Sequence, residues 1–540
     1  MDAELKKMVG QMMMVGFHSL EMDEQVKRVL ADFQVGNYIY FSRNINNAAQ
    51  VAKLSRSLNE AVYESLGISP FISADQEGGG VSRIIEGAAL IPGAAAVAAY
   101  AAPAAEEAAA ATSSPDGASS RYPSVQQLGC NMGQILRSVG VNMNLAPDMD
   151  VNIEPANPVI GCRSYGDDPE KVANLAISMM KGLKEGGVLP VLKHFPGHGN
   201  VNSDSHLGIP ENHTDRETLL ATEFRPFEKG VQAGAQAILT AHVRYQKVDP
   251  ENPATLSKTI VTDLLRKQYG FDGLILTDCL EMDAVRAAYG CGEGAVRAIE
   301  AGVDLLTISH TYEAAAEAAQ AIYAALESGR LSRERIEASY NRIMRMKEQM
   351  GLLAPQQVDE VAAAACIMEA DKLLLCRQIA AGSITLLTGE VKINAERPNF
   401  LVIAPDSQAS TGAEDMRTVS LVDRAAKRFG CLGMKMPLNG GAEEAVAMVA
   451  SAVKMGFEHI ILGLYNARFR PGQIAILREL EKMAGVHLTV ILLGAPYDLP
   501  LIERADGVLT CYEYTALSVE ALLDSLTDGK FPGRCPMKLS

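Results

Sequence analysis

Residues 189–199 read L-P-V-L-K-H-F-P-G-H-G, an apolar run of strand type that ends in a cluster of Lys, His, Pro and Gly. A short apolar run followed by a longer helix-patterned stretch recurs from residue 11 to residue 310. Besides Leu189–Lys193, the strand candidates are Gln11–Phe17, Asn37–Phe41, Pro70–Ala74, Val141–Ala146, Ala237–Ala241, Gly273–Thr277 and Val303–Ser309. Eight βα units in about 300 residues predict a closed parallel (β/α)8 barrel of the TIM type.

The stretches between these runs show helical periodicity. The helix candidates are Glu21–Phe33, Asn47–Leu66, Lys171–Glu185 and Thr218–Ala233. A doubly wound sheet is the alternative architecture, but such a sheet often carries a Gly-rich phosphate loop after its first strand, and none follows Phe17. The Ala-rich residues 94–122 interrupt the repeat, and we expect a helix there followed by a mobile Ser/Pro/Gly loop.

A second α/β series follows the barrel. We expect the barrel to occupy residues 1–350, a linker 351–370, and an open α/β/α sandwich 371–540. The strand candidates of the sandwich are Ile384–Leu387, Phe400–Ile403, Met434–Met436, His459–Leu464, Leu488–Leu493 and Gly507–Cys511. We expect no cluster of chemically active residues at the ends of these strands.

The composition narrows the classes of function. The chain has 540 residues, 48% of them apolar, and a formal net charge of −16, which argues against nucleic acid or an anionic membrane as the main partner. The nine Cys residues include no C-x-x-C pair, which favours free thiols in a reducing compartment. Neither a signal-peptide pattern nor a run of ~20 apolar residues is seen, so we expect a cytoplasmic protein.

The densest chemical cluster is residues 193–206, K-H-F-P-G-H-G-N-V-N-S-D-S-H, which contains three of the nine His. These side chains could ligate a metal, but a barrel metallohydrolase usually carries H-x-H after its first strand and this chain does not. They could also satisfy only the backbone of the loop. We favour acid/base chemistry, because Asp204 and His206 project to the same side of an extended loop, where the carboxylate would fix the imidazole tautomer.

Asp278 ends the seventh strand candidate, where a barrel places its catalytic groups. A helix N-cap is the alternative role for an isolated Asp at such a position. Charged residues that suit sugar hydroxyls are Asp75, Arg83, Arg163, Lys193 and His194.

The motifs that contain these residues resemble glycoside hydrolase family 3, and specifically its N-acetyl-β-glucosaminidase branch. The most specific string is K-H-F-P-G-H-G…D-S-H at 193–206. Further matching stretches are 75–83, 144–152, 157–166, 253–257 and 270–282. Two-domain members add an α/β/α sandwich, and residues 529–536 resemble the close of that domain, so the resemblance covers nearly the whole chain.

The resemblance implies that Asp278 is the catalytic nucleophile and that His206 is the general acid/base, assisted by Asp204. The residues that would bind the N-acetylglucosamine ring are Asp75, Arg83, Arg163, Lys193 and His194. It also implies retention of configuration through a covalent glycosyl-enzyme, with no metal or other cofactor. With substrate bound, we expect the Asp278 carboxylate and the His206 ring to approach within ~5–5.5 Å, and without ligand we expect the 197–204 loop to be mobile.

Four positions depart from the family pattern. Gly80 stands where Arg is common, Asn200 where Asp is usual, Gln246 where Pro is usual, and Cys279 where a second Asp is usual. None of the four removes a residue with an expected chemical role, but they leave the substrate preference open.

We therefore expect a retaining β-N-acetylhexosaminidase that acts on small glycosides of N-acetylglucosamine, such as peptidoglycan-derived muropeptides. A phosphorylase or a β-glucosidase built on the same residues is the close alternative. A non-catalytic sugar-binding protein and a metal-dependent hydrolase are the alternatives from other classes.

Overall fold

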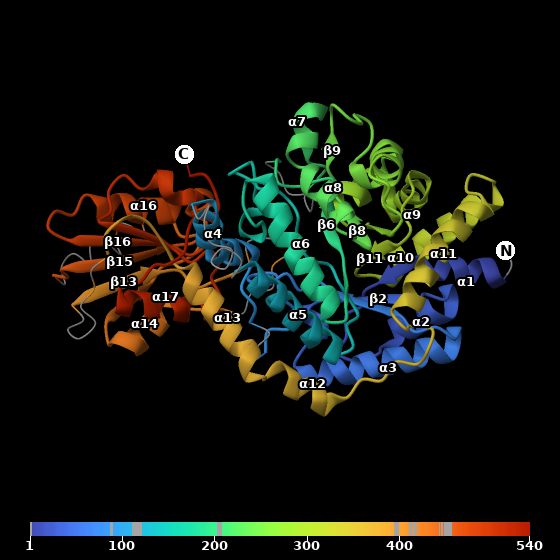
Figure 1. Cartoon of the computed structure of the whole chain (residues 1–540), viewed down its shortest axis with the longest axis horizontal. Helices are drawn as coiled ribbons and strands as arrows, with labels where there is room; N and C mark the ends of the chain where they lie inside the picture. Colours follow the sequence, from blue (N-terminus) through green and yellow to red (C-terminus); the bar gives the residue numbers. More distant parts are fainter. Residues whose placement is uncertain are drawn as a thin grey trace.

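The computed structural model describes residues 3–86, 90–110, 121–201, 208–391, 393, 399–409, 414, 418–441, 443, 447 and 456–539. Two α/β bodies lie side by side along the long axis of the molecule (Figure 1). Residues 111–120, which include the loop expected after the Ala-rich helix, lie outside the described residues. So do residues 202–207, which include Asp204 and His206.

The first body is the predicted parallel barrel. Its strands are β1 (Met13–Val15), β2 (Asn37–Tyr40), β3 (Phe71–Ala74), β4 (Met143–Asn144), β5 (Leu189–Pro190), β6 (Leu192–Phe195), β8 (Ala237–Thr240), β10 (Leu274–Thr277) and β11 (Leu306–Ile308). They pair in the orders β11-β1-β2-β3-β4-β5 and β10-β8-β6. A bridge between Leu276 and Leu305 joins β10 to the β11 side. Since β5 and β6 are two segments of one predicted strand, interrupted at Val191, all eight strand predictions are confirmed.

Helices surround the barrel. They are α1 (Ala3–Gln11), α2 (Glu24–Phe33), α3 (Ala48–Leu66), α5 (Tyr122–Ser138), α6 (Pro169–Glu185), α7 (Arg216–Ala221), α8 (Arg225–Gln232), η5 (Thr259–Gln268), α9 (Asp283–Ala301), α10 (Tyr312–Glu327) and α11 (Arg333–Gln349). Shorter elements of the connections are η1 (Ser42–Asn44), η3 (Gly161–Arg163), η4 (Ala254–Leu256) and the paired β7 (Glu211–Asn212) and β9 (Arg244–Tyr245). The prediction of one helix over Thr218–Ala233 is wrong, because Pro226 has no N–H to donate and α8 therefore starts anew at Arg225.

The second body is the predicted α/β/α sandwich. Its strands are β12 (Thr385–Gly389), β13 (Phe400–Ala404), β14 (Leu432–Lys435), β15 (His459–Leu464), β16 (His487–Leu492) and β17 (Gly507–Thr510), in the order β12-β17-β16-β15-β13-β14. Only the β12–β17 pair is antiparallel among these described strands. Its helices are α14 (Leu421–Phe429), α16 (Pro471–Glu481) and α17 (Ala516–Asp528), with the turns η6 (Ala467–Phe469) and η7 (Pro496–Leu501).

Side chains alternate between the two faces of the sandwich sheet. Leu401 and Ile403 of β13 belong to the core that includes residues of α16, whereas Phe400 and Val402 belong to the core that includes residues of α14 and α17. In Figure 1, α16 accordingly lies on one side of the strands and α14 and α17 on the other. Both faces of the sheet are therefore covered, as the near-continuous apolar strands require.

The Ala-rich segment forms helix α4 (Ala94–Ala110), which lies between the two bodies (Figure 1). Buried Ala95, Ala96 and Ala99 pack with Tyr512 of the sandwich and with Met537 near the C-terminus. Because alanine side chains are small, this helix lets the two bodies approach closely. The residues expected to form the linker contain helix α12 (Glu360–Ile367), which packs against α3 and α5. The next helix, α13 (Ala370–Ser383), packs against α4 and α17.

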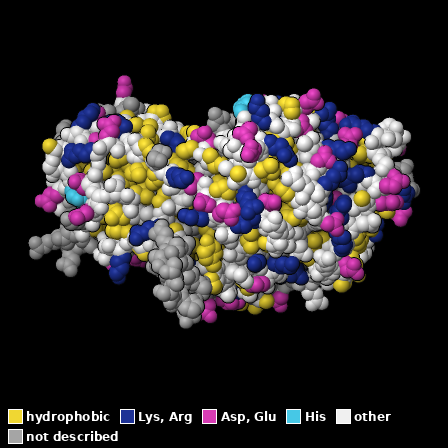
Figure 2. Space-filling model, turned by 45° about the horizontal axis from the view of Figure 1, so that its top comes forward, with side chains coloured by type: hydrophobic (Ala, Val, Ile, Leu, Met, Phe, Trp, Pro, Cys, Tyr) yellow, Lys and Arg dark blue, Asp and Glu magenta, His cyan; other side chains and the backbone are white. Residues whose placement is uncertain are grey.

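The described part of the chain contains no helix with the combined length and hydropathy needed to cross a bilayer. Acidic and basic side chains are interspersed over both bodies on the face shown in Figure 2.

Candidate active site

A cavity of about 300 Å³ opens at the carboxyl ends of the barrel strands. Asp75 directly follows β3 and Asp278 directly follows β10, while Lys193 and His194 lie in β6. The predicted site residues that line this cavity are Asp75, Arg83, Arg163, Lys193, His194 and Asp278. The structure therefore brings together every predicted site residue that it describes.

Buried ion pairs hold the floor of the cavity. The Nζ of Lys193 lies 2.7 Å from Oδ1 of Asp75 and 2.5 Å from Oε1 of Glu77. Arg163 donates to both Glu77 oxygens, from Nε at 2.9 Å and from Nη2 at 2.8 Å. Arg83 donates to Asp75 at 3.4 Å. Glu77 thus links two cations, and a bidentate guanidinium pair of this kind fixes both side chains in direction as well as in distance.

The charges of this floor reinforce one another. Burial by itself would raise the pKa of the Asp75 and Glu77 carboxyl groups, but the cations outweigh it. Lys193, then Arg83, holds the pKa of Asp75 below its usual value, and Arg163 with Lys193 holds that of Glu77 far below. Burial would lower the pKa of Lys193, yet the two carboxylates raise it. Asp75, Glu77 and Lys193 are therefore all charged at neutral pH.

His194 is oriented by a buried carboxylate. Its Nδ1 lies 2.6 Å from Oδ2 of Asp150, and Nη2 of Arg163 lies 3.4 Å from its Nε2. Because a carboxylate accepts and a guanidinium donates, this arrangement places the ring proton on Nδ1. The other Asp150 oxygen accepts the N–H of His198 at 2.6 Å. Asp150 therefore positions both the side chain of His194 and the start of the loop that follows.

The pKa values of two neighbouring carboxyl groups, Asp148 and Asp150, are shifted in opposite directions. Burial and the nearby Asp150 carboxylate raise the pKa of Asp148 well above its usual value. Burial would raise the pKa of Asp150 too, but the interactions with His194 hold it below its usual value. Burial, and secondarily His194, lowers the pKa of His198 to about 4, so this ring is neutral at neutral pH.

Asp278 is half-buried at the end of β10. Its Oδ1 accepts the N–H of Cys279 at 2.7 Å, and its own N–H donates to the Thr240 carbonyl at 3.3 Å. The backbone around the carboxylate is thus tied to the neighbouring strand β8. A carboxylate held this way at the cavity wall is suited to nucleophilic attack.

Asp204 and His206 lie outside the described residues, so their distance to Asp278 and the mobility of the 197–204 loop stay predictions. The described start of that loop is anchored. His198 lines the cavity, and Asn200 donates to Oε1 of Glu223 at 2.8 Å and to Thr214 at 3.1 Å. The described residues that precede the predicted acid/base segment are therefore held in place, and His198 lies at the cavity wall.

The positions that depart from the family pattern have local explanations. The N–H of Gln246 donates to the Asn212 carbonyl at 2.9 Å, a bond that the usual Pro could not make. Gly80 faces the Glu414 side chain, whose nearest atom would lie 3.5 Å from a Cβ added there. Neither change alters a residue that forms the ion pairs of the floor.

Sequence reasoning missed four residues of the floor: Glu77, Asp148, Asp150 and His198. Each is buried, and each lies within a few residues of a strand end or of the Lys193–His194 pair. That position was the available signal. Position in the sequence does not show which residues pair with one another. Asp75 and Glu77 are equally acidic in sequence, and only the fold shows that Glu77 bridges two cations.

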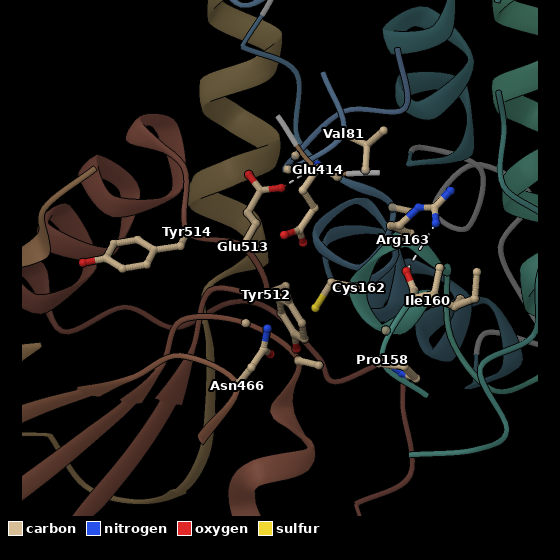
Figure 3. Close-up of a pocket in the computed structure, with 18 of the residues that line it drawn as sticks. Val81, Pro158, Ile160, Cys162, Arg163, Glu414, Asn466, Tyr512, Glu513 and Tyr514 are labelled. Carbon is tan, nitrogen blue, oxygen red and sulfur yellow. Dashed lines mark hydrogen bonds between the residues drawn. The ribbon is translucent and has the colours of Figure 1, made fainter. Parts of the chain in front are cut away.

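A second pocket lies between the two bodies (Figure 3). It shares Glu77, Val81, Val159 and Arg163 with the barrel cavity, so the two lie next to each other. In Figure 3, Cys162 and Arg163 approach from the barrel side and Asn466, Tyr512 and Glu513 from the sandwich side. Residues that line the pocket after β15, β16 and β17 include Tyr465, Asn466, Arg468, Tyr497, Tyr512 and Glu513.

The sandwich wall of this pocket is strained and buried. Asn466 and Tyr512 adopt left-handed backbone conformations, with φ of 50° and 64°. Oε2 of Glu513 accepts the N–H of Gly93 at 2.7 Å, and burial raises the pKa of Glu513 to about 7. A Cβ on Gly79 would lie 2.6 Å from that oxygen, so glycine is required at this approach.

Comparisons with known proteins agree along the whole chain. The model of the glycosyl hydrolase family 3 N terminal domain matches residues 4–346. Beta-hexosaminidase A of Pseudoalteromonas piscicida is 31% identical over 535 residues, which cover 91% of this chain and 85% of that protein. A beta-hexosaminidase of Neisseria meningitidis serogroup C is 34% identical over 297 residues, 55% of this chain and 77% of its own length. The structure of a glycoside hydrolase family 3 beta-N-acetylglucosaminidase from Paenibacillus sp. superposes with a TM-score of 0.89 at 34% identity and 99% coverage of both chains.

Proposed function

Because the chain belongs to glycosyl hydrolase family 3, we propose that it hydrolyses terminal β-linked N-acetylglucosamine from small glycosides, with retention of configuration. The observation that carries this proposal is the shared cavity. Asp278 faces the same space as the buried pairs of Lys193 with Asp75 and Glu77. A strand-end carboxylate beside a fixed set of hydrogen-bonding charges suits attack on the anomeric carbon of a bound sugar.

The floor of the cavity would bind the sugar hydroxyls. Asp75 and Lys193 offer an acceptor and a donor side by side, and charged groups make stronger hydrogen bonds to hydroxyls than neutral ones do. Arg163 adds a further donor, and His194, whose ring proton points to Asp150, offers its Nε2 as an acceptor. Since these groups are already paired, they need little reorganisation when the sugar enters.

The Asp278 carboxylate would attack the anomeric carbon and form the glycosyl-enzyme. His206, assisted by Asp204, would protonate the leaving oxygen as its bond to carbon breaks. The neutral His206 ring would then take a proton from the water that attacks the same carbon and releases Asp278. Support comes from the described chain that precedes these residues, which is anchored at His198 and Asn200.

The inter-domain pocket would receive the leaving group. It shares Arg163 with the sugar cavity, and aromatic and polar side chains of the sandwich form its far wall. A pocket of this kind suits a leaving group with its own polar substituents, and we propose peptidoglycan-derived muropeptides as the natural substrates. The absence of disulfides among the nine cysteines, all of them described, supports a reducing compartment such as the cytoplasm.

The test is turnover of a chromogenic β-N-acetylglucosaminide beside the matching β-glucoside, with and without phosphate. Release of N-acetylglucosamine that falls by about 10⁴-fold in Asp278→Asn is the expected result. The matched control is Asp283→Asn, five residues after Asp278. Asp283 forms an exposed pair with Arg286, and this variant should keep its activity. A sugar 1-phosphate product would move the proposal to a phosphorylase, and faster cleavage of the glucoside would overturn the substrate assignment.

A further inference from the structure

Cys279, Glu281 and His310 form a cluster that the sugar chemistry does not use. Sγ of Cys279, a carboxylate oxygen of Glu281 and a ring nitrogen of His310 all lie within 4.8 Å of one another. Cys279 and His310 also line the cavity that holds Asp278. We propose that this cluster is a binding site for Zn²⁺, with three protein ligands and an open fourth position toward the cavity, and that its occupation inhibits the enzyme.

The barrel places these three ligands. Cys279 and Glu281 follow β10, and His310 follows the neighbouring strand β11. The N–H of Leu280 donates to the Thr307 carbonyl at 2.9 Å and ties the two strand ends together. Ligands carried on adjacent strand ends are held more precisely than ligands on a long loop.

The carboxylate is oriented before any ion binds. Oε2 of Glu281 accepts the N–H of His310 at 2.6 Å, and Oε1 accepts the N–H and the hydroxyl of Thr311 at 3.1 and 2.7 Å. A carboxylate oxygen with one such bond keeps a lone pair for a metal. Among the described residues, no Lys or Arg forms an ion pair with Glu281, so its charge remains available to balance a cation.

The types of ligand select the ion. Thiolate, imidazole and carboxylate together suit Zn²⁺, whereas Mg²⁺ and Ca²⁺ prefer oxygen ligands alone. Tetrahedral Zn²⁺ takes sulfur at ~2.3 Å and nitrogen or oxygen at ~2.0–2.2 Å, which places ligand atoms ~3.3–3.8 Å apart. Because the present separations are at most 4.8 Å, the cluster has to contract by no more than about 1.5 Å to hold the ion.

The position of the site explains the expected inhibition. Cys279 and His310 line the same cavity as Asp278, so a dication held by them lies in the cavity of the proposed nucleophile. Its charge would lower the nucleophilicity of the carboxylate, and its open position would take up a ligand in the space meant for substrate. The inference goes beyond the proposed hydrolysis and is tested first by binding alone.

Cobalt is the probe, because Co²⁺ replaces Zn²⁺ and absorbs light. Titration of the full chain should give a thiolate-to-cobalt charge-transfer band and the visible bands of tetrahedral cobalt, saturating at one ion per chain and lost when Zn²⁺ is added. Cys279→Ser should abolish the charge-transfer band. Glu281→Gln and His310→Gln should each weaken cobalt binding by at least about tenfold.

Two variants serve as controls and should keep the wild-type spectrum. Cys291→Ser removes another buried thiol, whose Sγ donates to the Leu280 carbonyl at 3.4 Å. His213→Gln removes an exposed imidazole that lies 3.6 Å from Glu211. The other described cluster with three ligands, Asp148, Asp150 and His194, contains no sulfur, so an ion bound there gives no thiolate band.

The absence of a thiolate band in the wild type, or a band that persists in Cys279→Ser, would overturn the inference. If Cys279→Ser does not fold, the Glu281→Gln and His310→Gln titrations decide, and unchanged affinity in both is the contradicting result. Zn²⁺ inhibition is then measured relative to the metal-free rate of each variant. The half-inhibiting concentration should rise by about tenfold or more in Glu281→Gln, and an unchanged value would show that inhibition arises elsewhere.

Discussion

The barrel cavity and the inter-domain pocket meet at Glu77 and Arg163, yet they are built by different means. Buried ion pairs hold the cavity floor, where Lys193 contacts both Asp75 and Glu77. Around Glu513, the sandwich wall of the pocket relies on neutral hydrogen bonds and packing, whereas Arg468 elsewhere in that wall pairs with Asp498 at 3.0 Å. Glu513 accepts from a backbone N–H and a threonine hydroxyl, and no cation pairs with it among the described residues.

The difference separates two tasks. The floor has to hold charges in place around a polar sugar, so each charge has a partner of opposite sign. The pocket has to close one body of the protein against the other, so it uses small residues, tight turns and a carboxyl group that burial favours in its neutral form. Substitutions in the two regions should therefore have effects of different size and of opposite pH dependence.

The largest effect on stability is expected for Glu77→Gln. The variant removes the charge that links Lys193 and Arg163 and leaves both cations partly uncompensated, which should lower the free energy of unfolding by about 3–5 kcal/mol. Chemical denaturation at pH 7 measures it. Glu24→Gln, in an exposed pair with Lys27, is the control and should have no measurable effect. Equal stability of the two variants would show that the floor is not held by its ion pairs.

The pH dependence of stability should differ in sign between the two regions. The pKa of Glu513 is raised to about 7, so the folded protein binds a proton that the unfolded chain has already lost above its ordinary value near 4.5. Its contribution therefore falls by ~3 kcal/mol as pH rises from about 4.5 to 7 and is then constant. For Glu77, whose pKa is lowered, stability is present above the unfolded pKa and is lost as pH falls below it.

The measurement is the unfolding free energy of the wild type and Glu513→Gln at pH 5, 6, 7 and 8. Because Gln does not titrate, the free energy of unfolding of the variant should rise relative to that of the wild type as pH increases through this range. A difference between the two proteins that does not change with pH would contradict the assigned role of Glu513.

A smaller effect, on activity, is expected for Asp150→Asn. The amide leaves the fold of the floor in place but no longer fixes the Nδ1 proton of His194, so kcat/KM should fall by about a hundredfold. Steady-state kinetics with the chromogenic glycoside measures the change. Asn174, an exposed helix position, offers a control as Asn174→Asp, and activity equal to that control would mean that His194 needs no orienting partner.

The smallest effect is expected in the pocket wall. The Tyr497 hydroxyl accepts from the Asn152 side chain at 2.8 Å and donates to its carbonyl at 3.2 Å, which links sandwich and barrel. Tyr497→Phe should cost about 1 kcal/mol of stability and leave the cleavage of a small chromogenic glycoside nearly unchanged. A large loss of turnover would show that the second body acts directly on the sugar cavity.

The barrel could be predicted from sequence because its strands are short apolar runs in a regular repeat. All eight runs form strands, and the polar residues at their ends converge as the topology requires. The prediction of a single helix over Thr218–Ala233 was wrong, although Pro226 in the sequence indicated a break there. The partners of the floor could not be predicted, since the pairing of Glu77 with Arg163 spans a sequence separation of 86 residues and depends on the closed ring.

The inter-domain pocket was harder to predict for a physical reason. Its residues follow β15, β16 and β17, but Tyr465, Asn466 and Tyr512 are ordinary turn and core residues when the sequence is considered alone. Their role depends on the contact between the two bodies, which the alanines of α4 permit. Contacts between separate bodies leave no periodic signal in either of them.

The central claim is that Asp278 attacks the sugar held by the charged floor. The most direct measurement is mass spectrometry of peptides after incubation with a slow fluorinated β-N-acetylglucosaminyl substrate, which traps the glycosyl-enzyme. The account predicts one sugar on the peptide that contains Asp278, and no label in Asp278→Asn. A label on another residue of the active protein, or full turnover by Asp278→Asn, would contradict it.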